Sequence, residues 1–296
     1  MSNFNEILNR YVEFTEKELK EYNNYSHENR PQVKLIDAMN YSLRAGGKRI
    51  RPALVYAFCE ALGGQMETAS APACAIEMVH TFSLIHDDLP AMDDDDFRRG
   101  KPSCHKAFGE AMAILAGDAL AVLPFEIIAD SQSLSPEQKV LIISVLANSV
   151  GRDGMIGGQV IDMENENRTD VDEEELRNLY RCKTGQLIAV SCVMGAICAD
   201  ADNETIRAAA EYGLRLGFAF QIIDDILDVT STTEELGKPV GSDEESNKNT
   251  FVSVFGIEKA QEMADKATSE ALEWLDAVPN NDFLKELTGK LLKRKK

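Results

Sequence analysis

Apolar residues recur at helical spacing along almost the whole chain of 296 residues, and alternating apolar and polar runs typical of strands are scarce. No Pro/Gly-rich linker or shift in composition divides the chain. We therefore predict an all-α fold, with residues 1–296 forming a single domain, a large helical bundle around a central cavity. Helix signals and breaks place the helices at 4–22, 34–45, 52–62, 71–88, 108–130, 136–150, 172–199, 204–228 and 258–276.

Charge limits the classes of partner. The formal net charge is −19 at pH 7, which argues against nucleic acid or an anionic membrane, because both require a basic surface. The chain has no run of about 18 apolar residues, so no membrane span is expected. The start of the chain lacks the basic and apolar segments of a secretory signal. Six cysteines without CxxC spacing indicate reduced, mostly buried thiols, which together with these features predict a cytoplasmic protein.

Two aspartate clusters stand out in this helical pattern. The first, DDLPAMDDDD, makes six of the ten residues from 87 to 96 aspartate, and the second, DDILD, covers residues 224–228. Carboxylates repel one another, so such a cluster is best tolerated where a cation is shared among them. Mg²⁺ prefers oxygen ligands and commonly binds one or two carboxylates together with substrate phosphates. The two clusters therefore indicate an enzyme that handles a diphosphate through magnesium.

The second cluster has the simpler geometry, because it lies within one predicted helix. Asp224 and Asp228 are four residues apart and share a face, with Cβ atoms roughly 5–6 Å apart. Asp225 is three residues before Asp228 and is also its neighbour, while Gln221 lies one turn earlier and can position a substrate or a water. A solvated acidic face is the usual meaning of a charge run, but the apolar flanks of this one, such as Ile222, disfavour it.

The first cluster is interrupted by Pro90, which we expect to end the preceding helix near Asp88. Anions at a helix C-terminus oppose the helix dipole, and bound metal would reverse the sign of that interaction. Arg98 and Arg99 follow within a dozen residues. A carboxylate group followed by an arginine pair suits a magnesium-bridged diphosphate, which carries charge on two sides.

Basic residues also gather in GGKRIRP at 46–52, where glycines let the backbone approach a ligand and three cations follow, Lys48, Arg49 and Arg51. A basic turn alone is weak support, since such turns are common on any surface. His80 precedes Asp87 by seven residues, about two helical turns, and so lies on nearly the same face.

Three further segments interrupt the helical pattern. In KTG at 183–185, a hydroxyl followed by a glycine can bend a helix and free a carbonyl, although a tolerated glycine in a packed helix is the alternative. The glycine-rich run 151–158 lacks the strand context of a nucleotide loop, so we interpret it as close helix packing. The polar segment 230–250 is predicted to be a mobile loop.

The segments GGKRIRP, HTFSLIHDDLPAMDDDDFRRGKPSCH, KTGQL, FQIIDDILD and GKPVGSD occur in this order. Together they make the chain resemble the trans-isoprenyl diphosphate synthases, most closely the bacterial farnesyl diphosphate synthase type, from about residue 35 to 255. The resemblance implies an isoprenoid synthase-type bundle, a homodimer, and Mg²⁺-dependent head-to-tail condensation of isopentenyl diphosphate with dimethylallyl and then geranyl diphosphate. No protein nucleophile is needed for this reaction.

The resemblance also assigns roles to residues of this chain. Mg²⁺, three ions per site in this family, or alternatively Mn²⁺, would be held by Asp87, Asp88, Asp93, Asp224, Asp225 and Asp228. The allylic diphosphate would be bound by Arg98, Lys183 and Lys238. Isopentenyl diphosphate would be bound by Gly47, Lys48, Arg51, His80 and Arg99. The developing carbocation would face Lys183, Thr184 and Gln221.

Product length is assigned to Phe82 and Ser83. An aromatic ring five positions before Asp87 resembles the farnesyl-producing pattern and lies about 7.5 Å down the helix. On an ideal helix five residues turn a side chain about 140° away from Asp87, whereas Ser83 is nearly in line with it. Phe rather than Tyr at position 82 leaves a geranyl or mixed product open.

Other classes of protein share some of these features. A geranylgeranyl diphosphate synthase shares every motif but typically has a smaller residue at position 82. A terpene cyclase lacks the isopentenyl-site residues Lys48, Arg51 and His80. A non-catalytic regulatory subunit typically loses one aspartate motif, and both are intact here. A calcium buffer is disfavoured because the chain has no EF-hand loop.

Overall fold

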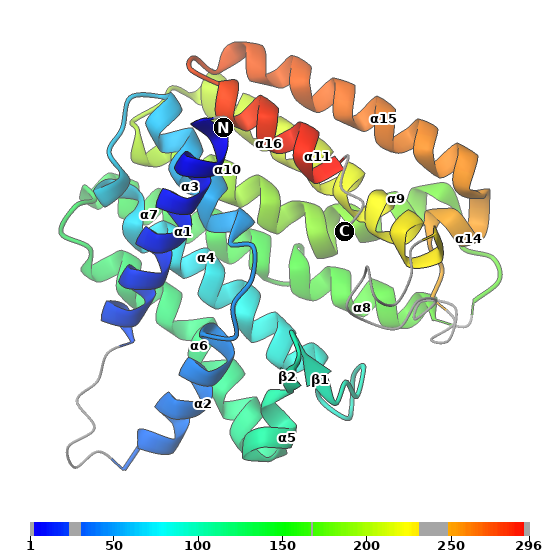
Figure 1. Ribbon diagram of the computed structural model, residues 1–296, viewed down its shortest axis with the longest axis horizontal. Coiled ribbons are helices and arrows are strands. Elements are labelled where there is room, and N and C mark those ends of the chain that lie inside the picture. The colour runs from blue at the N-terminus through cyan, green and yellow to red at the C-terminus, as the bar shows by residue number, and fades with distance from the viewer. Residues whose placement is uncertain (1–2, 24–30, 167, 231–247, 293–296) are drawn as a thin grey trace.

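The computed structural model describes residues 3–23, 31–166, 168–230 and 248–292, and within them helices make up nearly all regular structure. Lys238 and most of the predicted 230–250 loop lie outside these described residues. In chain order the elements are α1 Asn3–Tyr22, α2 Val33–Leu43, α3 Ile50–Ala61, α4 Met66–Asp87, β1 Phe97–Arg98, β2 Lys101–Pro102, α5 Cys104–Phe108, α6 Glu110–Asp130, α7 Pro136–Val150, α8 Met155–Asn165, α9 Glu173–Tyr180, the π-helix η1 Arg181–Gly185, α10 Gln186–Cys198, α11 Asn203–Thr230, α14 Phe251–Phe255, α15 Ile257–Trp274, η2 Leu275–Ala277 and α16 Asp282–Leu292 (Figure 1).

The all-α prediction is confirmed, and the described residues contain four α-helices that the sequence did not indicate, namely α5, α8, α14 and α16. Helix α8 contains two glycines, which lower helix propensity and made its start read as a break. Tertiary packing overrides that propensity, because a Cβ on Gly158 would collide with the backbone of Lys183. The close packing inferred for the glycine-rich run is therefore present, and it brings α8 against η1.

The predicted helix 172–199 is divided where the Thr-Gly pair occurs. Asp172 caps α9 in a capping box with Glu175, and the backbone widens to a π-helix over Arg181–Gly185 before α10 continues. Such π-bulges occur frequently at functional sites, because the extra residue redirects side chains and carbonyls. The irregularity predicted at KTG is therefore confirmed, and it occupies the segment that carries Lys183 and Thr184.

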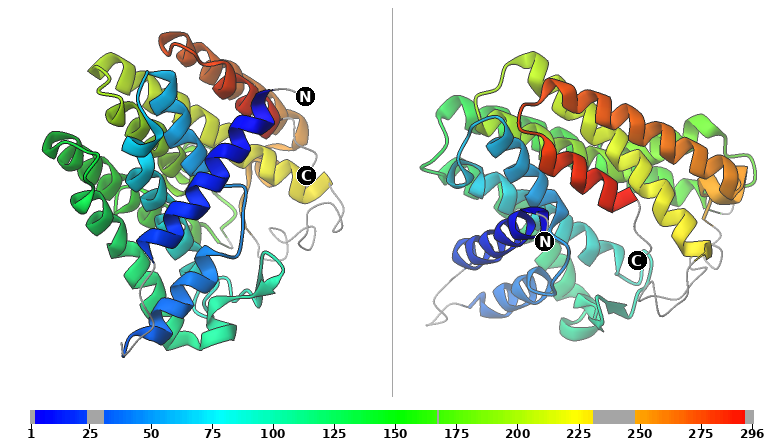
Figure 2. Two further views of the ribbon diagram at one scale, coloured as in Figure 1. Left: turned by 60° about the vertical axis from the view of Figure 1, so that its left-hand side comes forward. Right: turned by 45° about the horizontal axis from the view of Figure 1, so that its top comes forward.

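The core surrounds two helices that are apolar on most faces, α4 and α10. Helix α4 packs against α3, α6 and α10, and α11 packs against α10 and α15. Both views of Figure 2 show α15 lying along α11 near α16. A large hydrophobic cluster and a smaller one, built on α9, α11, α14 and α15, share Leu292 at their edges. The ends of α4 and α11 that carry the aspartate motifs therefore belong to the most constrained helices of the bundle.

A short antiparallel hairpin follows the first motif. Arg98 in β1 pairs with Lys101 in β2, and the turn residues Arg99 and Gly100 have φ of 53° and 75°. Positive φ at both central residues is the geometry of a tight hairpin turn, which glycine adopts without strain. The hairpin fixes the directions of two consecutive arginines beside the aspartates.

All six cysteines are buried and free, as predicted. By length and composition two helical stretches of the described chain, Glu110–Asp130 and Pro136–Asn165, could cross a bilayer. Buried helices of water-soluble proteins pass the same test, and 44% of the first window is buried within the bundle. These stretches are weak support for a membrane span.

Candidate active site

A cavity of about 580 Å³ opens between α4, α8 and η1. Its polar lining consists of Arg51, His80, Ser83, His86, Asp87, Gln159, Lys183 and Thr184. Its apolar lining includes Phe82, Ile114, Met155, Ile156, Val160, Met163 and Leu187. Ligand cavities of this size typically combine apolar walls with a few polar groups that fix orientation. This one suits a molecule with an anionic head and a hydrocarbon tail.

Two neighbouring stripes of α4 contribute to the cavity wall. Ser83 and Asp87 form one pair four residues apart, and Phe82 and His86 form the next, with their rings 5.8 Å apart in an edge-on arrangement. The cavity therefore spans more of the α4 surface than the single face through Asp87. This explains why Phe82 reaches the wall despite its rotation away from Asp87 on an ideal helix.

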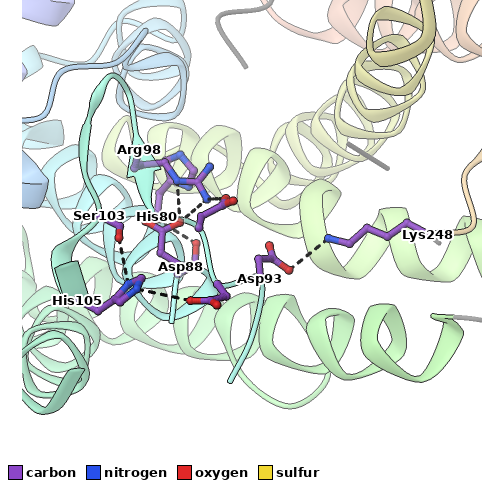
Figure 3. Close-up of polar contacts among 10 residues, drawn as sticks. His80, Asp88, Asp93, Arg98, Ser103, His105 and Lys248 are labelled. Carbon is purple, nitrogen blue, oxygen red and sulfur yellow. Dashed lines mark hydrogen bonds and ion pairs between the residues drawn. The ribbon is translucent and has the colours of Figure 1, made fainter. Parts of the chain in front are cut away.

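The first aspartate motif is balanced by cations on both sides (Figure 3). Asp88 is buried and accepts hydrogen bonds from the Arg98 guanidinium, including one of 2.9 Å from Nε. Arg98 also bonds Asp95 at 2.9 Å, and Lys248 lies 3.3 Å from Asp93. Asp88 is not part of the cavity wall, whereas Asp87 is. In this structure Asp88 therefore holds Arg98, and Asp87 faces the cavity.

The charged form of the Asp87 carboxyl is destabilised by its surroundings. Its pKa is raised to about 6, mainly by burial and also by Asp93 and Asp88, while Lys183 and Arg98 oppose the rise. Lys183 itself is paired with Asp162 of α8. A carboxylate with so perturbed a pKa in a cavity is a candidate for a functional group, and a bound cation would relieve the repulsion.

In the second motif, hydrogen bonds from two neutral side chains hold Asp225. Asp225 is buried, accepts a hydrogen bond from the Tyr180 hydroxyl and another from Gln221 Nε2 at 3.2 Å. Gln221 Oε1 in turn accepts from Thr184 Oγ1 at 2.8 Å, and Thr184 lines the cavity. Asp228 is also buried, while Asp224 is half-buried. This network joins α11 to the cavity wall through the π-helix.

The basic turn at 46–52 contains one internal and one cavity-facing arginine. Arg49, counted above among three ligand-binding cations, is instead buried, and it donates to Glu16 at 2.6 Å, Glu77 at 2.5 Å and the Leu43 carbonyl at 2.6 Å. Its φ of 48° places it in the left-handed region just before α3. Arg49 points inward because the carboxylates of Glu16 and Glu77 pair with its guanidinium inside the protein. Arg49 therefore anchors the turn.

The turn and the hairpin lie against each other. Gly47 has φ of 135°, and a Cβ there would come within 2.8 Å of the Arg99 guanidinium, whose Nη1 donates to the Gly46 carbonyl. The glycines are thus required both for backbone conformation and for the approach of Arg99. The two basic segments of the sequence form one cationic surface beside the cavity.

His80 and Arg51 lie deep in this surface. Burial lowers the pKa of His80 well below its usual range, helped by Arg51 and Arg99, so the imidazole is neutral. Burial also lowers the pKa of Arg51, partly opposed by Glu77 and by Asp224 of the second motif. The Arg51 Nε is buried without a hydrogen-bond partner. The Arg51 guanidinium is therefore available to bind an anion. Its electrostatic interaction with Asp224 brings the second motif near the cavity that Arg51 and Asp87 line.

The sequence model of the polyprenyl synthetase family matches residues 32–287. The chain belongs to this family. The resemblance to trans-isoprenyl diphosphate synthases is thereby confirmed, and the reaction class is that of a trans-prenyl diphosphate synthase.

Individual relatives agree with the family. The large subunit 1 of a heterodimeric chloroplastic geranylgeranyl pyrophosphate synthase from Arabidopsis thaliana is 45% identical over 251 residues, which cover 83% of this chain and 68% of that protein. A dimethylallyltranstransferase from Fischerella ambigua is 46% identical over 239 residues, 80% of this chain and 69% of that one.

Solved structures of other family members share the fold. An FPP/GFPP synthase from Zymomonas mobilis has a TM-score of 0.87 and 34% identity, with 98% of this chain and 99% of that chain covered. A geranyltransferase from Helicobacter pylori, solved with magnesium and isoprenyl diphosphate, has a TM-score of 0.83 and 36% identity, with coverage of 99% and 97%.

In this polyprenyl synthetase the structure brings many of the predicted site residues together. Arg51, His80, Phe82, Ser83, Asp87, Lys183 and Thr184 line one cavity, and Gln221 contacts Thr184. Arg99 lies against Gly47, and Arg98 is held by Asp88. Lys48 is exposed, and Lys238 lies outside the described residues.

Sequence reasoning missed four residues of the synthetase site. Gln159 lines the cavity, Asp162 pairs with Lys183, Lys248 pairs with Asp93, and Tyr180 holds Asp225. Gln159 and Asp162 stand in a helix that the sequence did not predict. Tyr180 precedes the KTG segment by three residues, so its position beside an expected irregularity was the one available signal.

Proposed function

We propose that the protein condenses isopentenyl diphosphate head-to-tail with an allylic diphosphate and releases diphosphate. The observation that carries this proposal is the division of one cavity into a charged part, with Asp87, Arg51 and Lys183, and an apolar part, with residues such as Ile156 and Met163. A diphosphate head and a prenyl tail match these two parts. Family membership supports the same reaction class.

Magnesium fits the donor set of the charged part. Asp87 carries a pKa raised by burial and by its acidic neighbours, so an oxygen-bound divalent cation would stabilise its charged form. Asp87 and Asp93, with Asp224 of the second motif, are the residues that we propose to hold Mg²⁺. When bound, the ion neutralises charge on the departing diphosphate. The geranyltransferase from Helicobacter pylori was solved with magnesium, which supports the choice of this ion.

The remaining residues have roles that follow from their contacts. Arg98 and Lys183 add positive charge beside the allylic diphosphate, which favours cleavage of its C–O bond. Arg51, Arg99 and neutral His80 bind the diphosphate of isopentenyl diphosphate.

The Thr184 and Gln221 oxygens face the carbon that becomes cationic. The isopentenyl double bond attacks that carbon, and one proton leaves to the released diphosphate.

For the product we propose farnesyl diphosphate, on the local geometry of Phe82. Its side chain is only 5% exposed, lines the cavity and lies about 7.5 Å along α4 from Asp87. A growing chain that extends from the diphosphate along α4 would meet this ring.

Geranylgeranyl diphosphate is the second candidate, and the comparisons favour it over farnesyl diphosphate. Most of the curated relatives reported as most similar are geranylgeranyl synthases, among them one from Catharanthus roseus at 46% identity over 247 residues. Phe82 is only one of several residues in the cavity wall. A fourth isoprene unit therefore fits if the growing chain bends toward Ile114 and Val160, which line the same cavity.

Mass analysis of products from dimethylallyl and isopentenyl diphosphates tests both candidates. The wild type is expected to release a fifteen-carbon product, and Phe82→Ala is expected to lengthen it by at least one five-carbon unit. Ser83→Ala is the matched control, because Ser83 also lines the wall but is already small.

A twenty-carbon wild-type product that Phe82→Ala does not change would support the second candidate and remove Phe82 as the limit. The absence of any prenyl product would contradict the proposed function itself.

We further propose that the protein is a single-domain homodimer located in the cytoplasm. Exposed apolar side chains on two adjacent helices support a dimer surface, namely Ile114, Leu115 and Val122 on α6 and Val140 and Leu141 on α7. Several relatives are named chloroplastic, so a plastid-type compartment is the alternative location.

Sedimentation of Val122→Lys is expected to give monomer. The control Val254→Lys, an exposed valine on α14, is expected to leave the dimer intact, and a dimeric Val122→Lys protein would exclude this surface.

A further inference from the structure

A second group of potential metal ligands lies outside the cavity. The ligand atoms of Asp94, Asp96 and His105 all lie within 4.8 Å of one another. None of the three residues lines the large cavity. The two aspartates lie at the end of the first aspartate cluster, directly before β1, and His105 is the second residue of α5. The group therefore joins the end of the motif segment to a separate helix.

His105 has the hydrogen-bonding pattern of a metal ligand. Its side chain is 2% exposed, and its Nδ1 lies 3.1 Å from the Ser103 hydroxyl (Figure 3). Its Nε2 is buried without a hydrogen-bond partner and faces Asp94, whose Oδ1 is 3.9 Å away. A ring that donates from Nδ1 to Ser103 keeps the Nε2 lone pair for another partner. Histidines that bind metals are typically oriented in this way by their second nitrogen.

Lys106 currently supplies positive charge to the two aspartates. Its Nζ lies 2.7 Å from Asp96 Oδ1 and 3.9 Å from Asp94 Oδ1. The lysine side chain is 41% exposed, so it can swing into solvent without losing packing. The Lys106 ammonium thus already lies beside both carboxylates, and a divalent ion would compete with it for this position.

We propose that Asp94, Asp96 and His105 bind one transition-metal ion of the Zn²⁺ or Co²⁺ type. One imidazole nitrogen and two carboxylate oxygens, with room for water, form a donor set that such ions accept. Mg²⁺ prefers oxygen ligands alone, so the site differs in selectivity from the aspartates that face the cavity. The inference goes beyond the proposed prenyl transfer and does not depend on it.

Occupation of this site would tie the motif segment to α5. Asp94 directly follows Asp93, and the Asp96 carbonyl already accepts a hydrogen bond of 2.9 Å from the Ser103 amide. An ion bound to the three side chains would restrict the segment that leads into the β1–β2 hairpin, and so the positions of Arg98 and Arg99. Binding to the folded state alone would raise the melting temperature.

The test is titration of the metal-free full chain with Co²⁺, followed by visible absorption, with Mg²⁺ and inorganic diphosphate present in excess to occupy the cavity site. The expected result is one Co²⁺ per chain, with absorption bands of a nitrogen-ligated ion. Asp94→Asn, Asp96→Asn and His105→Gln should each abolish binding. Ser103→Ala should weaken it about tenfold, and Lys106→Met should strengthen it.

The control is Asp118→Asn, which removes the acid of another His–Asp pair. In that pair His86 Nε2 lies 3.8 Å from Asp118 Oδ1, and among the described residues no third ligand lies close enough to complete a metal site. This variant should bind Co²⁺ as the wild type does. Asp94 and Asp96 are exposed, so their variants keep the fold even if His105→Gln does not. Absence of a Co²⁺ spectrum, or unchanged binding by Asp94→Asn and Asp96→Asn, would overturn the proposal.

Discussion

The two aspartate motifs use the same residue type in opposite ways. The first lies at the end of α4 and in the segment beyond it, where Asp93 is exposed and cations such as Arg98 and Lys248 balance the charge. The second lies within the continuous helix α11, where Asp225 and Asp228 are buried. Asp225 accepts hydrogen bonds from two neutral groups, the Tyr180 hydroxyl and the Gln221 amide.

This difference suggests that the first motif adjusts when ligands bind, whereas the second motif is preorganised. Charged partners on an exposed segment can be exchanged for substrate phosphates and metal ions, since each interaction is partly solvated. Hydrogen bonds within a packed helix fix side chains before any ligand arrives, which reduces the cost of organising the site. The first motif should therefore respond to ligands and pH, whereas the second should respond to the loss of a positioning partner.

The largest effect is expected from removing a carboxylate that we propose to hold Mg²⁺, either Asp87 in the cavity wall or Asp224 of the second motif. Asp87→Ala and Asp224→Ala should each lower turnover at least about a hundredfold, or roughly 2.7 kcal/mol of transition-state stabilisation. Steady-state assays of diphosphate release would measure this loss. The exposed Asp118→Ala should retain wild-type turnover. Normal turnover in Asp87→Ala or in Asp224→Ala would remove the corresponding motif from the mechanism.

A smaller effect is expected from Tyr180→Phe, which removes the hydroxyl that donates to Asp225 and accepts from the Phe251 amide at 3.3 Å. A hydrogen bond to a charged group contributes about 1.5–3 kcal/mol, so kcat should fall roughly tenfold to a hundredfold. The KM for isopentenyl diphosphate should not change, because that substrate is assigned to the other side of the cavity.

Tyr11→Phe is the matched control for Tyr180→Phe. It removes a hydrogen bond of 2.6 Å to the Glu60 carboxylate, between α1 and α3 and away from both motifs. It should leave kcat unchanged, whereas an unaltered kcat in Tyr180→Phe would show that the second motif needs no such support.

The smallest effect is on stability. The pKa of Asp87 is about 6 in the folded protein, above its ordinary value of 3.8, so its ionisation destabilises the fold at pH 7.5. Asp87→Asn should therefore raise the free energy of unfolding by roughly 1–3 kcal/mol at that pH without metal, and the gain should vanish as the pH falls toward 4.

Thermal melts in a chelator at pH 7.5 and pH 4 would measure the Asp87→Asn effect. Asp93→Asn, at an exposed position, should change little. A destabilised Asp87→Asn protein at pH 7.5 would show that the carboxylate is already compensated within the fold.

How far the sequence predicts this molecule depends on the range of the interactions involved. Helices with strong periodicity, such as α1 and α11, were predicted nearly to their ends because their signals are local. Helix α8 was not, because its stability comes from Gly158 packing against η1, a contact between distant segments. Tertiary packing of this kind has no signature in a short window of sequence.

The site divides in the same way. Clustered residues such as Asp87 and Asp88 can be recognised as site residues from the sequence, whereas isolated residues acquire a role only through the fold. Lys248 reaches Asp93 across 155 positions, and Tyr180 reaches Asp225 across 45. Arg49 is the opposite case, because the sequence suggested that it binds a ligand, whereas in the structure it forms salt bridges with Glu16 and Glu77.

The central claim is that Asp87 and Asp224 act on one diphosphate, and a double-mutant cycle tests it most directly. Calorimetry would measure binding of inorganic diphosphate with Mg²⁺ to the wild type, Asp87→Asn, Asp224→Asn and the double variant. We expect a coupling energy of at least about 1 kcal/mol, because both carboxylates bind the same Mg²⁺-diphosphate. Losses that add to within about 0.5 kcal/mol would show two independent sites and contradict it.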